Sequence, residues 1–175
     1  MLRSIKNSLF GKFIRSKPYT DSHERKIAIW KDIKTIAFLL DGTDAIALRI
    51  LLNRIYTYED EGKKVSLFGY VKKSPPFKQE PIKWITQKDL NWIGIPKMSN
   101  IKSFIEKDFD VLINTAEKSI RPLEFVSTYS KANLRIGLFE EKKTYCYDFM
   151  IRQLPGETVD DYLTQVELYL KMMNS

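Results

Sequence analysis

Two short stretches of the sequence hold the side chains best suited to chemistry. Asp41-Gly42-Thr43-Asp44 follows one apolar run, and Asn114-Thr115-Ala116-Glu117 follows another. Ligands of parallel α/β sheets bind where strands end and helices begin, and paired carboxylates can exchange protons or hold a divalent cation. These stretches predict a ligand rim, which consists of Asp41, Gly42, Thr43, Asp44, Asn114 and Glu117.

A structural role is the alternative for the same residues. Thr43 or Asp44 can cap the following helix, and Gly42 suits a tight turn. Two carboxylates would repel a phosphate, and a single glycine is too few for the dinucleotide-binding fingerprint. The sequence also lacks a Walker phosphate loop and any spacing typical of metal ligands. We therefore predict no catalytic residue, no cofactor and no metal site.

The single histidine and the single cysteine do not change this prediction. His23 lies in a charged stretch with no partner motif, so we expect a solvated surface residue. Cys146 alone excludes a disulfide framework and a cysteine-rich metal site, which suits a reducing cytoplasm. We expect Cys146 to be a strand residue without chemistry.

The elements that position the rim follow from hydrophobic periodicity. An apolar run at 33–40, a helical stripe from Asp44 to Asp60 and a second apolar run at 65–71 predict a strand, a crossover helix and a strand. Later apolar runs predict further strands at 82–86, 110–114, 134–139 and 145–151, the last at an edge. Later helices are predicted from a cap at Ser99 to Phe109, from Pro122 to Ser130 and after a capping box at Thr158. The residues of the last helix expected to face the core are Val159, Tyr162, Leu163, Val166, Leu170 and Met173.

This order of elements predicts a single Rossmann-like, three-layer α/β domain. Its sheet should be mostly parallel, with about five or six strands. We expect the domain to span residues 32–175, after a basic amphipathic tail at 1–18 and a linker or short helix at 19–31.

The tail carries five of the seven net positive charges of the chain and no acidic residue within the first 20 positions. Its apolar residues, at helical spacing, are Leu2, Ile5, Leu9, Phe10, Phe13 and Ile14. The basic residues expected to meet an anionic partner are Arg3, Lys6, Lys12, Arg15, Lys17, Lys72 and Lys73. The apolar stripe either packs on its own domain or a partner subunit, or lies on an anionic membrane, or accompanies contact with RNA or a ribosome.

Lys72 and Lys73 begin a basic, proline-containing loop, and Trp84 and Trp92 follow it. Aromatic rings beside lysines can stack nucleobases. We nevertheless expect both tryptophans in the core and the lysines in a solvated loop.

Three motifs resemble the N-terminal half of the heptosyltransferase-like GT-B glycosyltransferases. They are Leu40-Asp41-Gly42-Thr43-Asp44, Phe109-Asp110-Val111-Leu112-Ile113 and Ser130-Lys131-Ala132-Asn133-Leu134-Arg135-Ile136-Gly137. The resemblance implies an α/β fold, but those enzymes hold the nucleotide-sugar chiefly in a C-terminal domain, for which this chain has no room. The whole sequence is also similar to an uncharacterised family of small Bacteroidota proteins, which implies no mechanism.

We expect a non-enzymatic binding protein, whose basic helix docks the α/β body on a ribosome or RNA, a membrane surface or a partner protein. The alternative is an enzyme or small-ligand binder that uses the rim around Asp41 and Asp44, as a lone GT-B-like half. A third possibility is a structural subunit of a larger assembly. No stretch is apolar enough to span a membrane, so we expect the cytoplasm, with a peripheral place at the inner membrane if the tail binds lipid.

Overall fold

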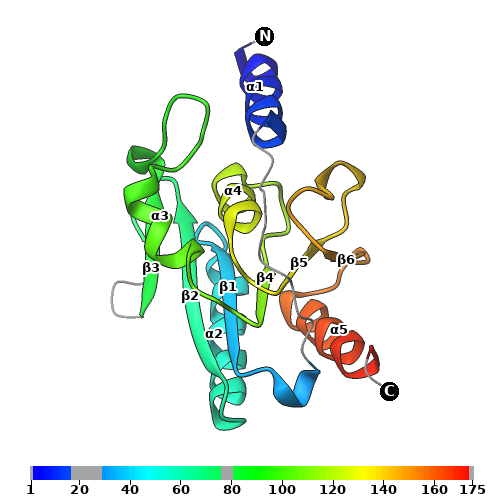
Figure 1. Cartoon of the computed structure of the whole chain (residues 1–175). Coiled ribbons are helices and arrows are strands. Elements are labelled where there is room, and N and C mark those ends of the chain that lie inside the picture. The colour runs from blue at the N-terminus through cyan, green and yellow to red at the C-terminus, as the bar shows by residue number, and fades with distance from the viewer. Residues whose placement is uncertain (1, 17–28, 76–80, 174–175) are drawn as a thin grey trace.

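The computed structural model describes residues 2–16, 29–75 and 81–173. Six strands form one parallel sheet in the order β3-β2-β1-β4-β5-β6, with helices on both faces (Figure 1). The strands are β1 Thr35–Asp41, β2 Lys64–Val71, β3 Ile82–Thr86, β4 Val111–Asn114, β5 Leu134–Leu138 and β6 Phe149–Ile151. The α-helices are α1 Leu2–Ser16, α2 Ala45–Asp60, α3 Met98–Ile105, α4 Arg121–Tyr129 and α5 Val159–Met172. The predicted fold class is confirmed.

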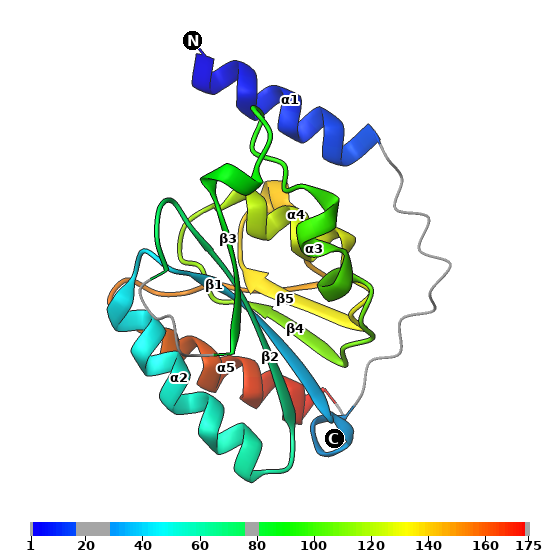
Figure 2. The same cartoon turned by 90° about the vertical axis from the view of Figure 1, so that its left-hand side faces the viewer.

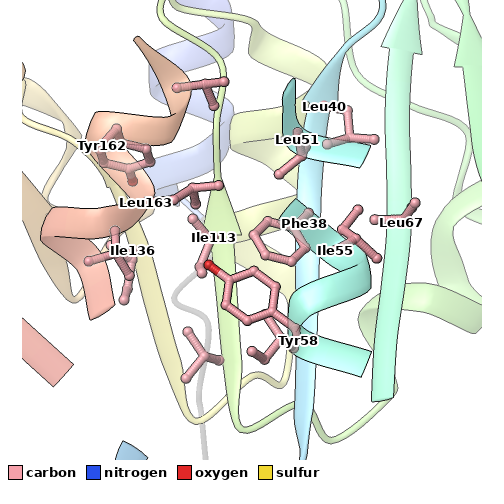
Figure 3. Packing of buried hydrophobic residues seen from close by; sticks show 14 of the residues in the cluster. Phe38, Leu40, Leu51, Ile55, Tyr58, Leu67, Ile113, Ile136, Tyr162 and Leu163 are labelled. Atoms are coloured by element: carbon pink, nitrogen blue, oxygen red, sulfur yellow. The ribbon is translucent and has the colours of Figure 1, made fainter. Parts of the chain in front are cut away.

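The central strand β1 separates two cores. Its inner residues from Ile36 to Leu40 are all buried, because helices cover both faces of a parallel sheet. Phe38 and Leu40 point to the core under α2 and α5 (Figure 3), whereas Leu39 packs in the core under α3 and α4. Alternate side chains of one strand thus enter different layers, which is the three-layer arrangement that the sequence predicts.

Helix α1 packs on the second of these cores. In Figure 2 it lies next to α4 and away from α2 and α5. Phe10 and Ile14 are only 4% and 3% exposed, and the ring of Phe13 stacks on that of Phe125 in α4 at 6.4 Å. Much of the apolar stripe is therefore covered by the protein's own body, and these three side chains do not face outward as a docking surface would require.

The other residues singled out in and near the tail are either exposed to solvent or outside the described part of the chain. Ile5 and Leu9 are 50% and 36% exposed. The side chains of Leu2, Arg3 and Arg15, and the whole of Lys17 and His23, fall outside the described part of the chain.

Three details of the predicted helices are wrong. In α2 the predicted apolar side is buried at Leu51, Ile55 and Tyr58, together with Leu48, whereas Ile46 of the same predicted side is 75% exposed. Ser99 does not cap α3, because the helix begins at Met98 and Lys97 occupies the cap position. Met173 is 43% exposed rather than part of the core, since α5 ends at Met172.

The predicted strand at 145–151 is shortened to Phe149–Ile151, and Cys146 lies in a turn. Tertiary contacts outweigh the apolar pattern there. Asp148 accepts hydrogen bonds from the backbone and the guanidinium of Arg135, and Lys143 pairs with Glu124 at 2.9 Å. These bonds hold residues 141–148 in a short 3₁₀ helix and a turn, which leaves three residues at the predicted edge of the sheet.

The predicted capping box of α5 is confirmed and gives a first test. Thr158 accepts a hydrogen bond from the backbone of Asp161, whose carboxylate binds Thr158 in return. We expect Thr158→Ala to lower the free energy of unfolding by about 1 kcal/mol in urea denaturation, because backbone donors of the first turn lose their partner. Thr158→Ser keeps the hydroxyl and should stay near wild type, and equal losses in both variants would contradict the capping role.

Candidate functional site

The candidate site lies at the carboxyl ends of β1 and β4. These neighbouring strands are paired from Ile36–Val111 to Leu39–Asn114, but their connections leave in opposite directions, toward β2 and toward β5. At such a switch point the two loops diverge and leave a crevice, where open α/β sheets hold their ligands. The predicted rim residues follow these two strands.

An acidic cavity of about 470 Å³ opens in this crevice, beside the first turn of α2. Its lining includes Asp41, Asp44 and Glu117, together with Thr43 and Lys118. The fold therefore brings together carboxylates that are more than 70 positions apart in the sequence.

The two aspartates of the first loop already have structural partners. One oxygen of Asp44 accepts hydrogen bonds from the backbone of Ile46 and Ala47, at 3.1 and 2.9 Å, and so caps α2. The capping interpretation of Asp44 is thereby confirmed. Asp41 Oδ1 accepts from the backbone and the hydroxyl of Thr43 at 2.9 and 2.7 Å, while its second oxygen has no hydrogen-bond partner among the described residues.

Gly42 is explained by packing. A Cβ atom at this position would lie 2.6 Å from Cζ3 of Trp84 and 3.1 Å from Cβ of Val71, so any side chain would collide with the ring. Trp84 itself is half-buried against the core under α2, as the sequence analysis expected.

Asn114 lies beneath the rim rather than at its surface. It is 4% exposed, donates a hydrogen bond to the hydroxyl of Tyr147 at 2.6 Å and accepts one from the backbone of Ala116. Burial raises the pKa of Tyr147 well above its ordinary value, so the phenol stays neutral. Asn114 therefore fixes the shape of the loop after β4 and does not face a ligand in this structure.

A second, basic cavity of about 550 Å³ adjoins the acidic one and shares Asp41, Thr43 and Lys118 with it. Four cations line it: Lys6 of α1, Lys72 after β2, Lys118 after β4 and Arg121 at the start of α4. These four cations come from three segments of the chain, namely α1, the loop after β2 and the connection from β4 to α4, so the fold gathers them at one place. Because low-dielectric walls concentrate the field of charges that they enclose, this cavity should attract anions.

The cations of the basic cavity differ in their partners. Among the described residues, no carboxylate forms an ion pair with Lys6, Lys72 or Lys118. Arg121 donates a hydrogen bond to the carbonyl of Ile93 at 3.3 Å, and its guanidinium lies 5.8 Å from the centre of the Phe10 ring. Arg121 therefore connects α1 and the 91–95 turn to the edge of the cavity.

Trp92, which the sequence analysis assigned to the core, is 66% exposed and lines the basic cavity. Its turn is closed by Asn91, whose side-chain oxygen accepts hydrogen bonds from the backbone of Ile93 and Ile95. Gly94 adopts the positive φ of 92° that completes this turn and favours glycine. The Trp92 ring is thus exposed to solvent on a turn that is held by hydrogen bonds, because its neighbours rather than Trp92 itself pack against the protein.

Sequence reasoning anticipated part of the basic site. It named Lys6 and Lys72, and the latter is indeed exposed on the loop after β2. Lys118 and Arg121 were missed, although they directly follow the predicted rim residue Glu117. Lys12 and Lys73 are exposed, but neither belongs to the lining of the two cavities.

Other groups offer little chemistry. Burial, followed by the charge of Glu124, raises the pKa of the Cys146 thiol, which disfavours the reactive thiolate. In the described ranges, no three His, Cys, Asp or Glu side chains gather in a way that could hold a metal ion. Across the same residues, no helix combines the length and apolar character needed to cross a bilayer.

No curated protein and no solved structure matches the chain. These comparisons therefore do not support the resemblance to heptosyltransferase-like enzymes or to a family of Bacteroidota proteins in particular. One family model, described as a family of unknown function, matches residues 6–173, which include most of α1 and the whole sheet. Because this match spans nearly the whole sequence, the chain belongs to the family DUF6913, a family of unknown function.

Proposed function

We propose that this protein binds a small, phosphate-bearing ligand in the basic cavity at the carboxyl ends of the strands. One observation carries the proposal: four cations from three separate segments line a single cavity at the switch point of the sheet. Cavities of 300–1,000 Å³ are typical of small-molecule sites, and about 550 Å³ falls in that range.

The acidic cavity restricts where in the crevice a phosphate group can bind. Asp44 already caps α2, and the carboxylates of Asp41 and Glu117 would repel an anion at that helix end. A phosphate group is therefore favoured on the side of Lys72 and Lys118. The ligand then meets cations at one end and carboxylates at the other.

Docking of α1 on a membrane, RNA or partner protein receives less support from this geometry. Phe10 and Ile14 are buried against α4. Among the described apolar side chains of α1, Ile5 and Leu9 are the exposed ones. Lys6 lines the basic cavity, so α1 forms part of the proposed ligand site.

Titration with inorganic pyrophosphate tests the proposal. Lys72→Gln and Lys118→Gln should each weaken binding about tenfold, because a hydrogen bond to a charged group contributes roughly 1.5–3 kcal/mol. Lys97→Gln is the matched control, since Lys97 is exposed and outside the cavity linings, and it should bind as wild type. Wild-type affinity should also fall as ionic strength rises.

The proposal fails if pyrophosphate does not bind, or if all three variants bind it equally well. Co-sedimentation with anionic vesicles or ribosomes that persists in Lys72→Gln and Lys118→Gln, but is lost in Ile5→Glu, would instead support docking through α1.

A further inference from the structure

We infer that the ligand is a nucleoside phosphate whose base stacks on Trp92. This inference rests on the proposed function and specifies the class of ligand. A nucleotide combines a flat aromatic base, a sugar with hydroxyl groups and a charged phosphate. The basic cavity offers a matching group for each of these parts.

The aromatic part is provided by Trp92. A large aromatic ring left 66% exposed loses the burial that usually stabilises a tryptophan, and this one lines the open basic cavity. Asn91 braces its turn through two backbone hydrogen bonds, and Arg121 holds the carbonyl of Ile93. Because the backbone that carries the ring is fixed in this way, less conformational freedom is lost when a base stacks on it.

The sugar part is provided by Asp41, which lines both cavities. One of its carboxylate oxygens is occupied by Thr43, and the other has no hydrogen-bond partner among the described residues. An ionised carboxylate accepts hydrogen bonds only, and the hydroxyls of a ribose can donate them. Asp41 lies at the end of β1, between the acidic and basic halves of the crevice.

The phosphate part is provided by the cations of the basic cavity, of which Lys72, Lys118 and Arg121 line the same space as Trp92. The cavity holds about 550 Å³, which is suited to one nucleotide and small for a nucleic-acid strand. These features favour a mononucleotide over RNA.

Binding of ADP and UDP, compared with pyrophosphate, tests this inference on the full chain by calorimetry and by tryptophan fluorescence. We expect at least one nucleoside diphosphate to bind about tenfold more tightly than pyrophosphate and to quench the exposed Trp92. Trp92→Leu should remove this advantage, whereas Trp92→Phe keeps an aromatic ring and should retain most of it. Pyrophosphate, which carries no base, is titrated into both variants as the reference, so that the ratio of its affinity to that of ADP or UDP reports the contribution of the ring.

The outcomes separate this inference from the proposed function. If ADP, UDP and pyrophosphate bind equally, and Lys72→Gln weakens all three, the phosphate site stands and the nucleotide assignment is overturned. An advantage of ADP or UDP that survives in Trp92→Leu overturns it as well. If none of the three ligands binds, both proposals fail.

Discussion

Replacing Glu124 by alanine is expected to lower the free energy of unfolding by about 3 kcal/mol, because the change removes one of the two carboxylates that pair with a buried lysine. Glu124 is 3% exposed on α4, and its carboxylate lies 2.9 Å from Nζ of Lys143. The same carboxylate accepts hydrogen bonds from Ser119 at 2.5 Å and Tyr145 at 3.3 Å. Chemical denaturation of the wild type and the variant measures the loss directly.

The size of this loss depends on what remains around Lys143. Burial alone would lower the pKa of Lys143, but Glu140 and Glu124 outweigh it and raise the pKa above its ordinary value. Glu140 still pairs with the amine at 2.8 Å, which is why we expect a loss at the low end of the usual range for a broken buried pair.

A double variant separates the lost pair from the lost packing. Glu124→Leu with Lys143→Met replaces both charges by apolar side chains and should recover most of the stability, since buried pairs often gain little over hydrophobic neighbours. A loss below about 1 kcal/mol in Glu124→Ala would show that water or Glu140 satisfies Lys143 without Glu124.

The elements near β1 were predictable because local signals agree with the fold. The apolar run of β1, the cap at Asp44 and the apolar face of α2 all lie within 30 consecutive residues. Each of these signals reflects burial or a local hydrogen bond, which a sequence pattern records directly.

The basic cavity was less predictable because it depends on the order of the strands. Lys72 and Lys118 lie 46 positions apart, and only the placement of β1 between β2 and β4 brings their loops to one crevice. Hydrophobic periodicity does not record this order. Trp92 was wrongly assigned to the core for a related reason. Apolar residues surround it in the sequence, and the sequence pattern does not show that Asn91 closes a turn there.

Glu124 and Lys143 illustrate a third limit. Both are charged residues that a sequence pattern assigns to the surface, yet the fold buries them as a pair. The turn at 141–148 forms around this pair, which explains why the apolar pattern at 145–151 overstates the length of β6.

The second large effect is expected at Gly69, in β2 beside the edge strand β3. This residue is paired with Leu40 of β1 and with Trp84 of β3. A Cβ atom at Gly69 would lie 2.2 Å from Cζ3 and 2.4 Å from Cε3 of the Trp84 ring. We expect Gly69→Ala to lower the free energy of unfolding by about 2–3 kcal/mol in urea denaturation, because the ring must move or the strands must separate.

Two further variants show whether the ring causes this loss. Ser66→Ala lies in the same strand, removes one hydroxyl and should have little effect. In a Trp84→Leu background, Gly69→Ala should cost much less than in the wild type, which a double-mutant cycle reports as coupling between the two positions. Equal costs in the two backgrounds would exclude the ring as the cause.

The Trp84 ring also explains why the rim has a glycine at Gly42. The same ring lies where a Cβ of Gly42 would be, at 2.6 Å, so one tryptophan on the edge strand requires glycine both within β2 and at the end of β1. Gly42→Ala should therefore be destabilising and should also be rescued by Trp84→Leu. A glycine that is required by packing need not approach a phosphate, and this agrees with a ligand phosphate held by the cations of the neighbouring cavity.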